Sequence, residues 1–335
     1  MRSALGAAAV VRHSGSMTNL EDRPREQVCD AAPRRGPVAE VHEARDVPLG
    51  GVRGMRVRRT LPQRALPLVG AWCFLDEFGP QDVEMRVLPH PHTGLQTVTW
   101  PLEGLIRHRD SVGSDVVVRP GQLDLMTAGH GVAHSEFSLD AASGPLHAVQ
   151  LWVALPEHVA DGPATFQQVT SPPVWSGPGV RATVFVGAIG DAHSPAVVHT
   201  PLLGADLALD AGTARVALDP AFEHAVLVLR GSADVAGVPL GTGPLLYLGD
   251  AREELVLRTQ APARVLLLGG EPLAQDVVMF WNFVGRDHET VARARADWED
   301  PERRAARFGQ VPGHGSDRIP APALPNVRLR PRRRG

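Results

Sequence analysis

The sequence of 335 residues contains no lysine, so all 34 of its basic residues are arginine. Without a lysine amino group, Schiff-base chemistry is excluded, and so is the lysine of a phosphate-binding P-loop. Only arginine remains for binding anionic substrates.

Cysteine is also scarce, since the chain has only Cys29 and Cys73. The two residues form neither a CxxC pair nor a disulfide framework, and this usage is typical of a protein in a reducing cytoplasm. We expect both cysteines to have structural roles.

Long apolar runs and a strong net charge are missing as well. No run approaches the roughly 18 residues needed to cross a bilayer, and LGAAAVVRH near the start is too short for a confident signal peptide. The formal charge of -3, from 34 basic and 37 acidic residues, provides no general electrostatic reason to bind nucleic acid or an anionic membrane. The sequence therefore predicts a cytoplasmic protein that binds neither nucleic acid nor membrane directly.

Short strands separated by turns are the dominant pattern. The chain has 34 glycines and 30 prolines, and they interrupt apolar or alternating runs such as LQTVTWPL, SDVVVRPG, AVLVLRG and ARVLLLGG. This spacing predicts an all-β fold built of sandwiches or barrels. One helix is predicted over residues 288–309, where helix-forming residues dominate and Gly309 stands at the expected stop.

The length suggests two domains of roughly 100 to 150 residues each. We expect residues 45–165 and 166–310 to form these domains. Residues 1–44 lack apolar periodicity and are expected to be a disordered leader, within which Met17 could also initiate translation. The Pro- and Arg-rich residues 311–335 are expected to be a solvated, disordered tail.

An internal repeat indicates that the two domains are similar. The segment VLPHPHTGLQTVTWPLEG (87–104) aligns without a gap with RVALDPAFEHAVLVLRG (215–231), and Ala217 and Asp219 then stand opposite the two histidines of HPH. Further along, RPGQLDLMTAGHGVAHSE corresponds to GTGPLLYLGDAREELVL, which keeps the strand pattern but has no HxE motif. The first half could therefore bind a metal through these motifs, and the second half could not.

Two short motifs contain the residues that could do chemistry. His90 and His92 in HPH are two positions apart, and His134 and Glu136 in HSE have the same spacing. Side chains two positions apart on a strand point to the same face. If the two strands lie side by side, all four groups converge; the alternative is that His90 and His92 are polar residues on the rim of a sheet.

Three imidazoles and one carboxylate would form a mixed nitrogen and oxygen ligand set. Such a set suits Fe(II), Mn(II), Cu(II), Ni(II) or Zn(II), and it leaves up to two octahedral positions open for substrate, water or O₂. Open positions favour catalysis over a structural metal site, because structural sites are usually closed. The presence of both motifs in one half, and of neither in the other, favours ligands over rim residues.

The stretch HPHTGLQTVTWPLEGLIRHRDSVGSDVVVRPGQLDLMTAGHGVAHSE resembles the signature of the pirin family, a branch of the cupin superfamily. The later GGEPLAQDVVMFWNFVGRDHETVARARADW resembles the C-terminal segment of that family, so the likeness covers residues 45–310. The resemblance implies a bicupin, two antiparallel β-barrels face to face with the metal in the N-terminal barrel. It also implies that one divalent ion, with Fe(II) the first expectation, is bound by His90, His92, His134 and Glu136.

The chain departs from the family pattern close to these motifs. Most cupins have a glutamate four residues after the second histidine of the first motif, whereas this chain has Gln96, which we expect to act at most behind the ligands. Thr93 stands where many pirins have arginine. His130 could be a fifth polar group near the metal, but a loop histidine bonded to the backbone is the simpler interpretation. The same interpretation applies to His108 and His147.

Some pirins resemble quercetinases, which cleave a flavonol or related phenol with O₂ and release CO. This likeness implies a quercetin 2,3-dioxygenase-like oxidoreductase with a small phenolic substrate, in which Glu136 either stays a ligand or takes the substrate hydroxyl proton. Trp100, Phe137 and Met126 could line its pocket, although core packing is commoner for such residues. Other pirins resemble non-catalytic redox sensors that bind a transcription factor or a metabolic enzyme, and the sequence leaves both functions open.

Overall fold

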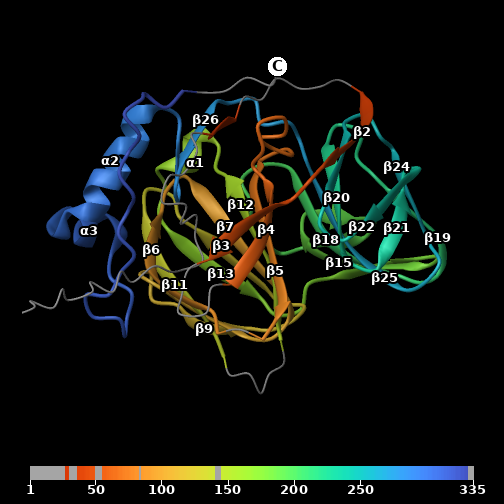
Figure 1. The fold of residues 1–335 in the computed structure, drawn as a ribbon, viewed down its shortest axis with the longest axis horizontal. Helices are drawn as coiled ribbons and strands as arrows, with labels where there is room; N and C mark the ends of the chain where they lie inside the picture. The colour runs from red at the N-terminus through yellow and green to blue at the C-terminus, as the bar shows by residue number, and fades with distance from the viewer. Residues whose placement is uncertain (1–26, 30–35, 50–54, 83, 140–144, 331–335) are drawn as a thin grey trace, which may run out of the picture.

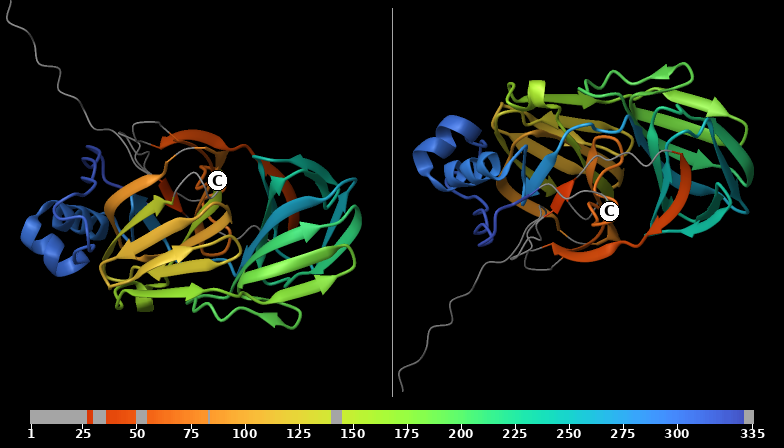
Figure 2. Two further views of the ribbon diagram at one scale, coloured as in Figure 1. Left: turned by 90° about the horizontal axis from the view of Figure 1, so that it is seen from below. Right: turned by 90° about the horizontal axis from the view of Figure 1, so that it is seen from above.

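Two β-barrels lie side by side in the computed structural model of the chain (Figure 1). The structure describes residues 27–29, 36–49, 55–82, 84–139 and 145–330. Two helices lie at the outer end of the first barrel, away from the second barrel (Figure 2). The predicted all-β bicupin is confirmed.

The first barrel consists of a seven-stranded and a four-stranded antiparallel sheet. The larger sheet has the order β13 (Thr165–Val169), β10 (Leu123–Thr127), β7 (Leu95–Glu103), β12 (Leu146–Ala154), β5 (Trp72–Gln81), β4 (Met55–Leu61) and β3 (Arg45–Leu49). The smaller sheet has the order β6 (Arg86–His92), β11 (Val132–Ser138), β8 (Ile106–Asp110) and β9 (Asp115–Val118). HPH and HSE therefore lie on adjacent strands of the smaller sheet.

The second barrel repeats this arrangement. Its larger sheet has the order β2 (Pro37–His42), β23 (Leu245–Gly249), β20 (Glu223–Arg230), β25 (Ala263–Gly270), β18 (Leu202–Leu209), β15 (Val180–Val186) and β14 (Val174–Gly177). Its smaller sheet has the order β19 (Gly212–Ala217), β24 (Glu254–Thr259), β21 (Ser232–Val235) and β22 (Val238–Gly241). Strands β6 and β7 correspond to β19 and β20, as the repeat predicts.

Smaller elements connect and flank the barrels. They are β1 (Gln27–Cys29), β26 (Val277–Phe280) and β27 (Phe283–Gly285) in a three-stranded sheet, the pair β16 (Ala188–Ile189) and β17 (Ala192–His193), and the helices α1 (Glu157–Ala160), α2 (His288–Glu299) and α3 (Pro301–Phe308). Strand β27 also touches the end of the HPH strand, because Thr93 forms an isolated bridge with Phe283.

Each barrel is completed by a strand that belongs, in sequence, to the segment preceding the other barrel. Strand β2 directly precedes β3 of the first barrel but pairs with β23 of the second. Strand β13 directly precedes β14 of the second barrel but pairs with β10 of the first. The expected division into 45–165 and 166–310 misses this exchange, because the pattern of an edge strand does not say which sheet it joins.

The two barrels share one hydrophobic core. The indole nitrogen of Trp72 donates to the carbonyl of Leu203 at 3.2 Å, and that of Trp100 donates to the Asp206 carboxylate at 2.8 Å. Trp100 also stacks on Phe185 of the second barrel, with 4.9 Å between ring centroids. These contacts hold the barrels in a fixed relation.

The single helix predicted over residues 288–309 is wrong, because α2 ends at Glu299 and α3 begins at Pro301. Proline lacks the amide hydrogen that a continuous helix needs at this position, but it suits the first turn of a new helix. Asp300 caps α3, since its Oδ1 accepts from the amides of Glu302 and Arg303 at 3.1 and 3.0 Å.

The expected disordered tail is also wrong for residues 311–330. Val311, Ile319 and Leu329 are buried in the cluster that includes Trp298 of α2, and the Trp298 indole donates to the Ile319 carbonyl at 2.8 Å. Single apolar residues between prolines and glycines show no periodicity, so the sequence does not reveal this packing. The expected disordered leader is wrong for residues 27–29 and 37–42, which form β1 and β2, because short edge strands have too little apolar periodicity to stand out. The rest of the leader up to residue 35, and residues 331–335, lie outside the described residues.

The cysteines differ in what the structure shows of them. Cys73 is fully buried, and its Sγ lies 3.5 Å from the Trp152 carbonyl oxygen. The side chain of Cys29 lies outside the described residues. Among the described residues, no helix has both the length and the apolar composition that a membrane span requires.

His224 is an unusual residue of the second barrel. Its side chain is fully buried, and neither of its ring nitrogens has a hydrogen-bond partner. Burial lowers the pKa of this imidazole from 6.5 to about 4. As the pH falls below 6.5, His224 is therefore protonated in the unfolded chain before it is protonated in the folded chain. The free energy of unfolding decreases as a result until about pH 4.

His224→Leu is therefore expected to stabilise the protein. The gain is about 1 to 2 kcal/mol near neutral pH, since an unsatisfied buried polar group is removed, and it widens by up to roughly 1.4 kcal/mol per pH unit below the unfolded pKa. Thermal melting at pH 8 and pH 5 measures both effects. His193→Leu, at an exposed position, serves as the control. An equal gain in stability at pH 8 and pH 5 would contradict the lowered pKa of His224.

Candidate metal centre

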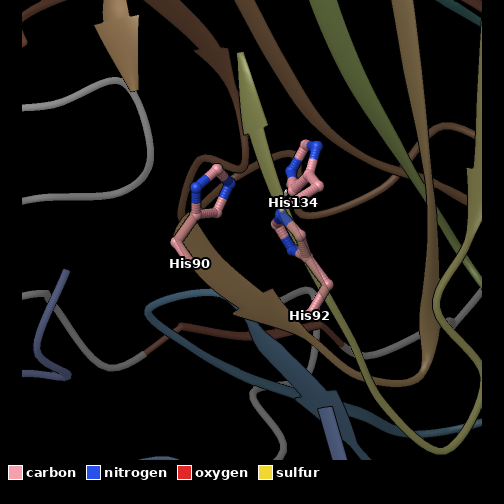
Figure 3. Close-up of side chains that lie close together, drawn as sticks. All are labelled: His90, His92 and His134. Carbon is pink, nitrogen blue, oxygen red and sulfur yellow. Dashed lines mark hydrogen bonds between the residues drawn. The ribbon is translucent and has the colours of Figure 1, made fainter. Parts of the chain in front are cut away.

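Three histidines meet inside the first barrel, on the inner face of its smaller sheet (Figure 3). His90 and His92 lie on β6, and His134 lies on β11 directly opposite His90 in the strand pairing. The ligand nitrogens of the three lie within 4.8 Å of one another, and the Nε2 atoms of His92 and His134 are 3.1 Å apart. All three side chains are buried. HPH and HSE therefore do converge.

The hydrogen bond of His90 determines which of its nitrogens is available. The Leu88 carbonyl can only accept, so His90 Nδ1 carries the hydrogen and donates to it at 2.9 Å. His90 Nε2 then has a lone pair, is buried, and has no hydrogen-bond partner. A buried polar atom without a partner requires an explanation, and a bound metal ion is one that satisfies it.

His134 is oriented from behind by His108 and Asp110. The Nδ1 atoms of His134 and His108 are 3.4 Å apart, and His108 Nε2 is 3.1 Å from the Asp110 carboxylate. Burial alone would raise the pKa of Asp110, but hydrogen bonds from His108 and Ser114 lower it, so the carboxylate is ionised and accepts. His108 Nε2 then donates to Asp110, His108 Nδ1 accepts from His134 Nδ1, and His134 Nε2 presents its lone pair to the other imidazoles.

His108 is a residue whose position the sequence interpretation missed. It is buried, stacks on Phe166 with ring centroids 4.6 Å apart, and forms a second group with His134 and Glu136 that could hold a metal. His108 and Asp110 are two positions apart, as are the paired residues of HPH and HSE. This spacing could have indicated that His108 and Asp110 share one face of a strand.

Glu136 lies beside the histidines and is buried. Its Oε1 accepts a hydrogen bond from the Thr99 hydroxyl at 2.9 Å. The β11 strand shifts its register between His134 and Glu136, and the carboxylate groups most closely with His108 and His134. Burial raises the pKa of Glu136, and a neighbouring cation would oppose this effect.

The histidines are neutral at physiological pH. Burial lowers the pKa of His90 to about 3 and the pKa values of His92 and His134 well below 6.5. A neutral imidazole is the form that binds metal, so the site needs no proton loss from these residues near neutral pH.

A small cavity of about 20 Å³ opens in front of the three histidines and Glu136. Its other walls come from the larger sheet of the first barrel and consist of Val57, Phe74, Asp76, Phe78, Gln150 and Trp152. This volume holds one water-sized group. The polar end of the cavity is therefore the imidazole cluster, and most of the remaining wall is apolar.

A continuous stack of side chains forms part of that wall. The Trp152 ring meets His92 edge to face at a centroid distance of 5.2 Å and stacks on Phe74 at 4.0 Å. The guanidinium of Arg59 covers the Phe74 ring at 4.5 Å. Arg59 is held by two hydrogen bonds of 2.7 Å to Asp76, and both residues are buried. The stack thus connects a buried ion pair with a histidine of the cluster.

The large apolar residues that the sequence singles out, Trp100, Met126 and Phe137, are not among those that line this cavity. Trp100 and Met126 are core residues. Phe137 points to the outer side of β11, where it contacts the ring of His314 at 5.3 Å. Core packing, the commoner interpretation, holds for the first two. The aromatic wall residues were missed because sequence patterning does not say which interior positions border a cavity.

Gln96, His130 and His147 also lie away from the cavity lining. Gln96 is buried and donates to the Thr127 hydroxyl and to the Val197 carbonyl, both at 2.9 Å. His130 is on the surface, with 57% of its side chain exposed. His147 bonds to the Glu77 carboxylate at 3.1 Å. Each is bonded to its surroundings or exposed, as expected for residues that do not bind the metal.

Comparison with known proteins identifies the family. The Pirin model matches residues 54–153, and the model described as Pirin C-terminal cupin domain matches residues 204–304. The first matched segment covers most of the first barrel and contains the described residues that could hold a metal, and the second covers much of the second barrel and α2. The chain belongs to the pirin family.

Several individual relatives are similar over most of the chain. "Putative quercetin 2,3-dioxygenase PA1205" of Pseudomonas aeruginosa is 43% identical over 92% of this chain and 98% of its own length. A crystal structure of quercetin 2,3-dioxygenase from Acinetobacter baumannii aligns with a TM-score of 0.79 and 38% identity, over 86% of this chain and 96% of that one. The nickel(II) complex of the Escherichia coli pirin YhhW shares the fold, with a TM-score of 0.58 and 18% identity over 70% of this chain and all of that one.

Proposed function

We propose that this pirin is a mononuclear metal-dependent dioxygenase acting on a flavonol or related phenol, with His90, His92, His134 and Glu136 as the metal ligands. The observation that carries the proposal is the convergence of three buried, neutral imidazoles with a carboxylate at a cavity walled by stacked aromatic rings. The names of the relatives from Pseudomonas aeruginosa and Acinetobacter baumannii support the same reaction.

The residues fit a divalent transition metal. Nitrogen and oxygen donors of this kind suit iron, manganese, copper and nickel, and the lone pair of His90 Nε2 lacks any other partner. Iron is our first expectation, while the E. coli relative binds nickel(II). The ion would supply a Lewis acid and a redox-active centre beside the cavity.

The protein side chains would orient the substrate and move its proton. The Phe74, Phe78 and Trp152 side chains line the cavity with apolar surface of the kind that a phenolic ring contacts. Glu136 either remains a ligand or accepts the proton of the substrate hydroxyl, and its raised pKa favours such an exchange. The Thr99 hydroxyl holds the carboxylate in either role. The buried surroundings exclude water from the reacting groups.

The size of the cavity favours a second candidate function. A space of about 20 Å³ admits a water-sized group but not a flavonol, so turnover requires the apolar wall to move. A redox sensor requires no such movement, because oxidation of a bound metal changes the local charge and thereby the surface presented to a protein partner. The alternative is therefore a non-catalytic regulator that binds a transcription factor or metabolic enzyme.

Anaerobic metal loading followed by exposure to air separates these functions. Protein loaded with Fe(II), Mn(II), Cu(II) or Ni(II) is mixed with quercetin in air, while substrate loss and CO are measured. The dioxygenase is expected to consume quercetin and release CO with at least one metal. Loss of quercetin without CO would indicate autoxidation and count against the reaction.

Absence of turnover with every metal would favour the sensor. Hydrogen exchange of the Fe(II) and Fe(III) forms would then be compared, since a sensor must present different surfaces in the two states. Metal-free protein is the control for both measurements.

A further inference from the structure

A second cavity, of about 260 Å³, lies outside the first barrel. Strands β6 and β11 form its floor, helices α2 and α3 form one wall, and the segment 309–318 forms the other. Figure 2 shows these helices against the end of the barrel, where they cover the outer side of the sheet whose inner side bears the histidines. The volume is far larger than that of the metal cavity and close to the lower end of the roughly 300 to 1,000 Å³ range of ligand pockets.

Arg304 of α3 is a cation without a counter-ion in this cavity. Its Nη1 donates to the Trp298 carbonyl at 3.0 Å, and no carboxylate of the described residues lies within ion-pair distance of it. Burial and the nearby Arg318 lower the pKa of Arg304, while the more distant carboxylates of Glu299 and Asp300 raise it, and the guanidinium remains charged at neutral pH. A partly buried cation of this kind is stabilised by an anion.

Arg318 is the second guanidinium in the lining. It forms two hydrogen bonds with Glu299, at 3.1 and 3.2 Å, which hold it in place. The guanidinium groups of Arg304 and Arg318 lie 5.8 and 5.7 Å from the centroid of the Trp298 ring. Both guanidinium groups therefore line the cavity beside the Trp298 ring and are near enough to act on each other electrostatically, and guanidinium groups are the donors that best suit carboxylate or phosphate.

Another part of the lining, around His314, lies against β11, the strand of His134 and Glu136, and Arg109, Arg86 and Arg107 act on this imidazole electrostatically. Asp317 is near His314, and burial together with Arg109 lowers the pKa of His314, so this imidazole is neutral. His314 Nε2 is 2.9 Å from the hydroxyl of Ser135. Ser135 stands between His134 and Glu136 in the sequence and faces the opposite side of β11.

We propose that this cavity is a binding site for a small organic anion, a carboxylate or a phosphate ester, whose charged group contacts Arg304 and Arg318. The remainder of the ligand extends toward the neutral His314. Because the floor of the cavity is the outer side of β11, the bound anion lies behind the strand of His134 and Glu136. This site is separate from the metal cavity and does not depend on the reaction proposed above.

Isothermal titration calorimetry of the full chain with inorganic phosphate and, separately, with citrate tests the proposal, at an ionic strength held constant with chloride. We expect saturable binding of one anion per chain. Arg304→Gln should weaken that binding at least tenfold, because the uncompensated charge is removed. The matched control is Arg303→Gln on the same helix, where the arginine is exposed and pairs with Asp297 and Asp300 outside the cavity.

Ala305→Asp provides an independent variant, since it adds a negative charge to the lining without removing a hydrogen bond. It too should weaken binding at least tenfold, with a melting temperature close to that of the parent. Phosphate binding without citrate would identify a phosphate ester as the ligand class, and the reverse would identify a carboxylate. The proposal is overturned if neither anion saturates, or if Arg304→Gln and Ala305→Asp both bind like the parent.

Discussion

His134→Ala is expected to purify with less than a tenth of the metal that the parent protein holds. His134 Nε2 lies 3.1 Å from the corresponding nitrogen of His92 and faces the unpartnered Nε2 of His90, so its loss removes a donor between the other two. Loss of a residue that only supports a ligand costs about 10- to 100-fold in affinity, and loss of the ligand itself should exceed this. Elemental analysis and chelator competition measure the effect.

Two further variants test whether the effect is specific. His130→Ala removes an exposed histidine four residues away and should retain full metal. His108→Phe keeps a ring that can stack on Phe166 but removes the hydrogen bond with His134. Its metal content should lie between that of His134→Ala and that of His130→Ala. Full metal content in both His134→Ala and His92→Ala would refute the ligand assignment.

Arg59→Met should lower the free energy of unfolding by about 3 to 5 kcal/mol, because it leaves the buried Asp76 carboxylate without its guanidinium partner. Arg59 is 2% exposed and Asp76 5%. The same change uncovers the Phe74 ring, which stacks on Trp152 beside His92. Denaturant unfolding of the metal-free protein gives the stability, and metal titration shows whether the cavity wall is disturbed.

An exposed pair of the same geometry provides the control. Arg107 and Asp115 also form two hydrogen bonds of 2.7 Å, but their side chains are 43% and 49% exposed. Arg107→Met should therefore cost less than about 1 kcal/mol. Replacing both buried partners, in Arg59→Met with Asp76→Leu, should recover most of the loss, since no charge then remains unpaired. Equal costs for Arg59→Met and Arg107→Met would contradict this account.

The sequence predicts the convergence of HPH and HSE because the relevant information is local. Residues two apart on a strand share a face, so HPH and HSE each present two groups in one direction. The repeat then indicates two equivalent barrels, and the structure brings His90 and His134 opposite each other across β6 and β11. Glu136 groups with His108 because the two are direct partners in the pairing of β11 with β8, and the sequence pattern does not say which strand lies on the other side of β11.

Features that depend on distant pairing were not predictable in this way. The aromatic wall of the metal cavity comes from β5 and β12, which read as ordinary buried strands. The break between α2 and α3 has a local signal, which is Pro301 itself. The packing of Ile319 against Trp298 has no such signal in the sequence. Strand β13 was mostly assigned to the second domain and β2 to a disordered leader, because the partner of each strand lies far along the chain.

The exchange of β2 and β13 has a consequence for how such a protein can evolve. Each half of the chain carries the closing strand of the other barrel, so deleting either half would expose a sheet edge on the survivor. In the part of the chain that the structure describes, both groups of residues that could hold a metal lie in the first barrel. The interior of the second barrel can therefore accept substitutions without touching that site, whereas loss of β13 would open the sheet edge at β10.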